Sequence, residues 1–221
     1  MIAVALTIAA VSGRVWAANS GAAASYWQVG YYTPSGRALS LAAAPAASGG
    51  VASLNFTNQP NTALLVTENK AQFPTLLGDL SGKTVSASFT VSGLTDGASF
   101  RYYGEPNECG TAANVRYFFE TSNAGGFNET HYWWSNPVSI NLNTVNGLTS
   151  LPAVSFTGKN WSDYYGNFGN KSAYAAGFNA AVSNVTMIGL SFGGGCFFEN
   201  GVSTTNGSGT FTLNTFTVSE A

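Results

Sequence analysis

Charge is what this sequence has least of. Only 8% of its 221 residues are Asp, Glu, Lys or Arg, and the formal net charge at pH 7 is -2. A protein that binds nucleic acid through the phosphate backbone needs a cluster of Lys and Arg side chains, and the sequence has no such cluster. We therefore expect no nucleic-acid partner, and a surface that is polar but nearly uncharged.

Cysteine and histidine are also scarce. Cys109, Cys196 and the single histidine, His131, have none of the spacings of a zinc site. An even number of cysteines in an exported protein is typical of a disulfide, so we expect Cys109 and Cys196 to be bonded; two free buried thiols are the alternative. The bond would close a loop of roughly 88 residues and stabilise the fold by about 4 to 5 kcal/mol through loop-closure entropy.

Long hydrophobic runs are missing. The apolar run at residues 2–11 is shorter than the ~20 residues that a membrane-spanning helix needs. With Val15, Trp16 and Ala17 after it, this run is typical of a secretory signal cleaved after Ala17. No Lys or Arg precedes the run, which leaves open that the signal is incomplete; an N-terminal membrane anchor is the alternative. We expect residues 1–17 to be a signal peptide, residues 18–24 a linker, and the mature protein to be secreted, extracellular or periplasmic, without a membrane span.

What the sequence does contain is typical of short strands and turns. Apolar and polar residues alternate over residues 83–92, which predicts a strand with one buried and one solvated face. Over residues 115–121 both alternating sets contain aromatics, so we expect this strand to be covered on both faces. A Gly-containing turn and the run at residues 130–134 complete a predicted hairpin.

The whole pattern predicts an all-β protein. Roughly ten or more short strands are separated by turns every eight to twelve residues. The one credible helix covers residues 173–182, with Ser172 as its N-cap. We predict a single domain over residues 25–221, an antiparallel β-sandwich of the jelly-roll type with one short helix.

Three stretches of sequence resemble a known family. The alternating strand at 83–91, VRYFFE at 115–120, and NVTMIGLSFGGG at 184–195 followed by GSGTFTLNTFTV are similar to the galactose-binding-like jelly rolls of secreted bacterial carbohydrate-binding modules. The similarity covers roughly residues 76–218 and consists of the order of the strands and the general pattern of their residues. It implies non-catalytic glycan binding. Such modules often hold a structural Ca²⁺ through loop oxygens; this sequence has no D-x-D-x-D loop, and we leave calcium open.

Two aromatic clusters fit a carbohydrate ligand. A sugar ring has an apolar face and a rim of hydroxyls, so its site needs exposed flat rings flanked by polar side chains. Because Trp133 and Trp134 are neighbours in a strand, they point to opposite faces. Core packing is the alternative for each ring. We predict ligand contacts from a first cluster, Tyr132, Trp133 and Trp134, or a second, Trp161, Asp163, Tyr164 and Tyr165.

Catalysis has less support. A glycosidase needs two carboxylates placed across the scissile bond, and no acids here form a motif of that kind; we expect Glu120 to pair with Arg116 on one strand face. His131 is accompanied by no G-x-S-x-G motif. We therefore expect an exported, non-catalytic carbohydrate-binding protein. The alternatives are a structural or adhesive surface protein that self-associates, and a polysaccharide-active enzyme without a recognisable motif. Exposed aromatics on one concave face would favour binding, and an unpaired edge strand would favour assembly.

Overall fold

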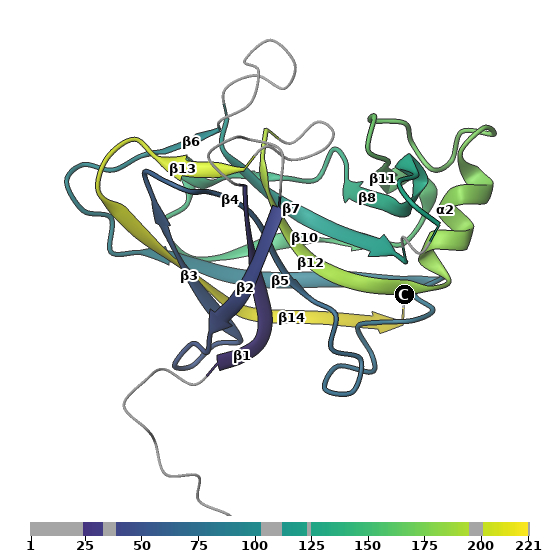
Figure 1. Cartoon of the computed structure of the whole chain (residues 1–221), viewed down its shortest axis with the longest axis horizontal. Coiled ribbons are helices and arrows are strands. Elements are labelled where there is room, and N and C mark those ends of the chain that lie inside the picture. Colours follow the sequence, from purple (N-terminus) through teal and green to yellow (C-terminus); the bar gives the residue numbers. More distant parts are fainter. Residues whose placement is uncertain (1–23, 33–38, 103–111, 123–124, 195–200, 221) are drawn as a thin grey trace, which may run out of the picture.

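The fold is seen in a computed structural model that describes residues 24–32, 39–102, 112–122, 125–194 and 201–220 (Figure 1). The predicted signal peptide and both cysteines lie outside these residues. Ten strands form the larger sheet, called sheet A: β1 Ala24–Tyr32, β2 Leu39–Pro45, β4 Asn61–Thr67, β6 Phe100–Tyr102, β7 Asn114–Thr121, β8 Tyr132–Ser135, β9 Ile140–Asn141, β11 Trp161–Ser162, β12 Val185–Gly193 and β13 Val202–Thr204.

The order in sheet A is β11-β8-β7-β12-β4-β1-β2, while β13 pairs with β4 and β6, and β9 pairs with β7. The smaller sheet, sheet B, has the order β10-β5-β14-β3. Its strands are β3 Ala52–Thr57, β5 Lys83–Ser92, β10 Gly147–Ser155 and β14 Ser208–Glu220. The helical segments are α2 Ala175–Val182 and the 3-10 turns η1 Glu129–His131, η2 Leu142–Thr144 and η3 Gly158–Asn160.

The strand order confirms the predicted fold class. The chain runs in order through β3, β4, β5, β7, β8, β10, β12 and β14. We number these eight strands by their order in the chain. Sheet B then has the order 1-8-3-6, which is β3-β14-β5-β10, and sheet A has the order 2-7-4-5, which is β4-β12-β7-β8. This alternation between two antiparallel sheets is the jelly-roll arrangement. Strands β1 and β2 extend sheet A beyond β4, and β11 extends it beyond β8.

The main core lies between the two sheets. Side chains of β5 alternate as the sequence predicts, with Val85, Ala87 and Phe89 buried and their neighbours facing away. The rings of Phe89 and Phe211 stack with centroids 4.8 Å apart. Aromatic rings from both sheets thus contribute to the core. From sheet A it receives, among others, Trp27, Leu65, Tyr117, Phe119, Ile188 and Leu190.

Helix α2 packs at one end of the sandwich. Its buried Phe178 lies 5.0 Å from Trp133 and 6.2 Å from Phe119, measured between ring centroids. The helix begins two residues later than predicted, and its N-cap is Tyr174, without a side-chain hydrogen bond. The prediction of Ser172 as cap is wrong, because Ser172 lies in a turn that precedes the helix. In this turn the backbone carbonyl of Lys171 accepts hydrogen bonds from the backbone N–H groups of Tyr174 and Ala175. In the described part of the chain, no helix has the length and hydropathy needed to cross a membrane.

Candidate functional site

The predicted hairpin is present and carries the candidate site. Strands β7 and β8 pair antiparallel, with Phe118 opposite Trp134 and Phe119 opposite Trp133. Since side chains alternate along a strand, Phe119 and Trp133 belong to the core between the sheets. Phe118 and Trp134 belong to a second, separate cluster on the other side of sheet A.

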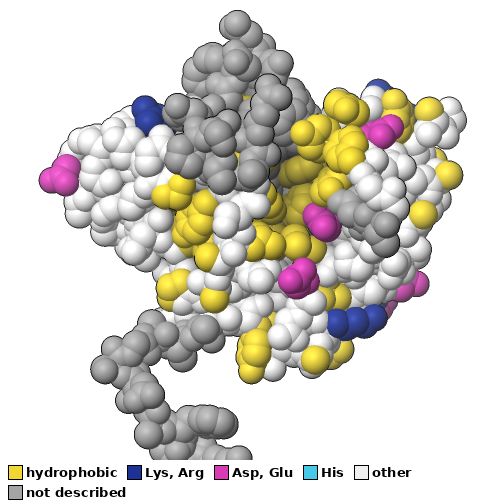
Figure 2. All heavy atoms as spheres, in the orientation of Figure 1, with side chains coloured by type: hydrophobic (Ala, Val, Ile, Leu, Met, Phe, Trp, Pro, Cys, Tyr) yellow, Lys and Arg dark blue, Asp and Glu magenta, His cyan; other side chains and the backbone are white. Residues whose placement is uncertain are grey.

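This second cluster gives sheet A an apolar outer face. Its buried members include Leu64, Val66, Phe118, Trp134 and Met187, from four strands. Partly buried Tyr32, Tyr132 and Tyr164 pack against them. Figure 2 shows hydrophobic side chains gathered in a hollow over β7 and β12, with acidic side chains at its border. We call the part of this surface formed by Phe118, Phe127, Tyr132, Trp134, Tyr164 and Tyr165 the aromatic face.

The rings of the aromatic face form a series in which solvent exposure increases from the inner to the outer rings. Phe127 and Tyr132 lie 5.8 Å apart with an interplanar angle of 24°, and Tyr132 and Trp134 lie 6.4 Å apart at 23°. Tyr164 stands nearly perpendicular to Phe127, at 82° and 5.1 Å. Exposure rises outward, from 4% for Trp134 to 59% for Phe127 and 63% for Tyr165. The inner rings thus fix the outer ones, which remain open to a ligand.

Two loops hold the exposed rings in place. The fully buried Asp163 accepts hydrogen bonds through Oδ1 from the backbone N–H groups of Tyr165 (3.0 Å) and Asn167 (2.8 Å). Asn128 caps η1 by accepting from the backbone N–H of Thr130 at 2.9 Å. The backbone N–H of Tyr164 donates to the Glu129 carbonyl at 3.4 Å, which joins the loops. Short Asx turns of this kind fix loop geometry.

Polar groups anchor the inner end of the series. The indole Nε1 of Trp134 donates to Ser191 Oγ at 2.9 Å. The guanidinium carbon of Arg116 lies 5.8 Å from the centre of the Trp134 ring, and Arg116 is fully buried. A guanidinium within about 6 Å of an indole is attracted to its ring face. Trp134 is therefore fixed in orientation and supports Tyr132 above it.

Glu120 is a carboxyl group beside the aromatic face. It lies opposite Tyr132 in the β7–β8 pairing. Burial, and secondarily the charge of Glu68, raise the pKa of Glu120 to about 7. An arginine partner would lower the pKa instead. The expected ion pair with Arg116 is corrected: in the described part of the chain no ion pair joins Glu120 to Arg116, and four residues along a strand place their Cα atoms about 13 Å apart.

Burial also corrects part of the predicted ligand set. Trp133 and Trp161 are both 0% exposed. The indole Nε1 of Trp133 donates to the Thr130 carbonyl at 2.7 Å, and that of Trp161 donates to the Ser155 carbonyl at 3.0 Å. Their rings are part of the core and offer no face to a ligand. Asp163 acts on the site only by holding its loop. Of the predicted residues, Tyr132, Trp134, Tyr164 and Tyr165 are brought together.

The structure adds residues that sequence reasoning missed. Phe127 is an exposed aromatic in a Gly-Gly-Phe-Asn turn, and its polar neighbours were a signal that could have identified it. Glu68 and Met187 had no such signal, because they join the site only through the pairing of β12 with β4 and β7. Among the described residues, no group of three or more His, Cys, Asp or Glu is placed to hold a metal ion.

Comparison with known proteins gives no match among protein-family models, curated proteins or solved structures.

Proposed function

We propose that the protein is an exported, non-catalytic carbohydrate-binding protein whose ligand lies on the aromatic face. The observation that carries the proposal is the series Phe127, Tyr132 and Trp134, with nearly parallel rings fixed from within and exposed at the outer end. Flat rings of this kind match the C–H face of a sugar. The resemblance to galactose-binding-like modules supports the same ligand class.

The surroundings suit a neutral ligand. The carboxyl of Glu120 and the phenol hydroxyls of Tyr132, Tyr164 and Tyr165 supply hydrogen-bonding groups beside the rings. Burial and the neighbouring Tyr165 raise the pKa of Tyr164, so its hydroxyl stays protonated at neutral pH. Apolar surface with few convergent polar groups is typical of small-molecule sites. Export and the Cys109–Cys196 disulfide belong to the same proposal.

A glycan array tests the proposal. We expect wild type to bind one or more neutral oligosaccharides, and Tyr132→Ala to weaken binding about tenfold, because it removes the ring between Phe127 and Trp134. Tyr165→Ala should weaken it less. Tyr26→Ala is a matched control, since Tyr26 is a 57% exposed tyrosine packed on Phe73, outside the aromatic face. Absence of binding to every glycan, or equal loss in the control, would contradict the proposal.

Self-association is a second candidate function. Strand β2 forms the edge of sheet A, contains no charged residue, and exposes Leu39 by 42% and Leu41 by 37%. An exposed edge strand without charge is a template for pairing with another chain. Sedimentation velocity distinguishes the two functions: concentration-dependent oligomers without glycan binding would favour a structural or adhesive protein.

A further inference from the structure

The outer face of sheet B has a different chemistry from that of sheet A. Serine and threonine occupy the outward positions of β5 and β14, and they pair across the strands. Ser86 Oγ and Thr217 Oγ1 lie 2.8 Å apart, and Ser88 Oγ and Thr215 Oγ1 lie 2.7 Å apart. In each hydroxyl pair one O–H remains free to donate, and lone pairs remain free to accept. The surface therefore offers both donors and acceptors without charge.

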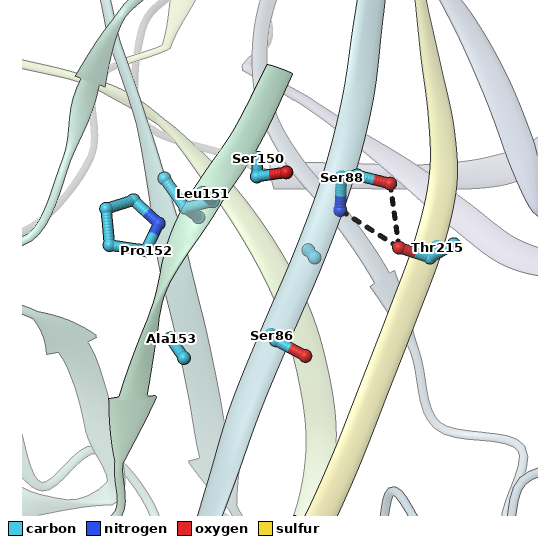
Figure 3. A pocket seen from close by; sticks show the side chains of 8 residues that line it. Ser86, Ser88, Ser150, Leu151, Pro152, Ala153 and Thr215 are labelled. Carbon is cyan, nitrogen blue, oxygen red and sulfur yellow. Dashed lines mark hydrogen bonds between the residues drawn. The ribbon is translucent and has the colours of Figure 1, made fainter. Parts of the chain in front are cut away.

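A bulge in β10 hollows this face. Leu151 pairs with Ala87 and Val154 with Val85, so Pro152 and Ala153 together lie opposite Ser86, and β10 contains one extra residue here. Beside the bulge lies a depression of about 440 Å³ (Figure 3). The depression is shallow and open to solvent, so it would contact a ligand from one side only. Residues of three strands line it: Ser86, Ala87, Ser88, Ser150, Leu151, Pro152, Ala153 and Thr215.

The lining matches a neutral polyhydroxylated ligand. None of the lining residues is charged, which disfavours anions and cations alike. Pro152 and Ala153 of β10 provide apolar contact for C–H groups, and the hydroxyls of Ser86 and Ser88 on β5 and of Ser150 on β10 provide hydrogen bonds (Figure 3). Without an aromatic ring the depression has less apolar contact area than the aromatic face. Its affinity for one short oligosaccharide should therefore be lower.

We propose that the depression beside the β10 bulge is a second binding site for neutral carbohydrate, on the sheet opposite to the aromatic face. The second site is inferred from the residues that line the depression. If the aromatic face also binds glycan, one chain holds two polysaccharide strands at once, and this consequence rests on the proposed function. Two weak sites on opposite faces cross-link long polymers, since each polymer offers many copies of the ligand.

NMR titration of the ¹⁵N-labelled full chain tests the second site. The probes are cello-, laminari-, xylo- and mannohexaose. With at least one of them we expect the amides of Ser86, Ser88, Ser150 and Thr215 to shift in wild type and equally in Tyr132→Ala. Ala153→Arg places a long charged side chain in the depression from an exposed position and should abolish these shifts. Ser219→Arg, exposed on β14 and outside the depression, is the matched control and should retain them.

The outcomes separate the two proposals. Shifts confined to the aromatic face, or equal behaviour of Ala153→Arg and Ser219→Arg, would overturn the second site and leave the proposed function intact. Shifts confined to the depression would support the second site alone. Absence of shifts with every probe would overturn both. If both sites bind, wild type should make solutions of the long polymer turbid, whereas Tyr132→Ala and Ala153→Arg should each fail to do so.

Discussion

Glu120 shows how burial changes a single residue of the candidate site. Its side chain is half-buried beside Tyr132 and Met187, where water stabilises a carboxylate less than in bulk. Loss of solvation is the larger cause of its raised pKa, and the negative charge of Glu68 adds to it. With a pKa of about 7, the carboxyl changes charge close to neutral pH.

This titration predicts how stability depends on pH. Between pH 4.5 and about 7 the folded protein keeps a proton on Glu120 that the unfolded chain has lost. The stabilising contribution is therefore complete below pH 4.5 and is lost as pH rises through 7. After solvent screening we expect a loss of about 1 to 2 kcal/mol from pH 4.5 to 8. Glu120→Gln, which stays neutral, should remove this part of the loss in urea unfolding at the two pH values.

Glu220→Gln is the control, because Glu220 lies on sheet B with its side chain 86% exposed. The same pH dependence of stability in Glu120→Gln as in wild type would contradict the assignment of the titration to Glu120.

The Glu120→Gln variant also addresses the enzyme alternative. A carboxyl that titrates near neutrality beside a second carboxylate is an arrangement that glycosidases use. Polysaccharide turnover by wild type that is lost in Glu120→Gln would favour that alternative.

At the scale of elements, Gly189 decides whether β12 can pair. A Cβ at this position would lie 2.2 Å from the Leu65 carbonyl oxygen and 2.7 Å from Val66 Cα, both in the backbone of β4. Neither atom can move without breaking the ladder between β12 and β4. Strand β12 is central to sheet A, between β7 and β4. The close approach therefore affects the strands that carry the aromatic face.

We accordingly expect Gly189→Ala to lower the free energy of unfolding by about 3 kcal/mol, as overpacking against fixed backbone does. Chemical denaturation measures the change. Gly125→Ala is the matched control, because a Cβ at Gly125 meets nothing within 4 Å, and it should change stability by less than about 0.5 kcal/mol. Equal effects of the two substitutions would show that the approach of β12 to β4 can relax.

Strands with strong alternation could be predicted from the sequence, and strands made by pairing could not. Strand β5 has the predicted bounds, and the β7–β8 hairpin is confirmed. Strands β11 and β13, of two and three residues, were missed because they are too short to show a period. Strand β2 continues to Pro45 through three consecutive alanines, a residue type with low strand propensity. Its conformation comes from pairing with β1.

The candidate site was predictable in part for the same reason. Alternation establishes that Trp133 and Trp134 face opposite ways, but which of them faces the core depends on the position of sheet B. In the structure, the side chain of Trp133 packs in the core between the sheets, and that of Trp134 packs on the outer face of sheet A. Trp161 was predicted to contact the ligand, yet its ring stacks on Phe156 with the centroids 5.0 Å apart and an interplanar angle of 5°. Tertiary packing, absent from the local pattern, decides such cases.

At the scale of the whole molecule, the two sheets turn different chemistry outward. Sheet A presents aromatic and aliphatic side chains, and sheet B presents serine and threonine hydroxyls. The only ion pair between described residues is Lys83 to Glu220, at 3.9 Å, where β5 and β14 pair at the end of the ladder. Because the sequence contains few charged residues, the outer faces of both sheets also contain few.

The predicted disulfide is a property of the whole sandwich. Cys109 precedes β7 by five residues and Cys196 follows β12 by three, and both lie outside the described residues. The adjoining strand ends are side by side: Asn114 pairs with Gly193, and its Nδ2 donates to the Gly194 carbonyl at 2.8 Å. A bond between the cysteines would thus join two segments that leave neighbouring strand ends. It would close the part of the chain that contains the aromatic face.

Reduction should therefore lower the melting temperature by about 10 °C or more, since about 4 to 5 kcal/mol is lost in a protein of this size. Differential scanning calorimetry of the protein purified under oxidising conditions, with and without reductant, measures the shift. Cys109→Ser combined with Cys196→Ser should melt like the reduced wild type and should not respond to reductant. Such a bond would act on the unfolded chain and would not touch the proposed glycan site, so any glycan binding at 25 °C should be unchanged in the double variant. Mass spectrometry that found two free thiols in the same oxidised preparation would reject the bond outright.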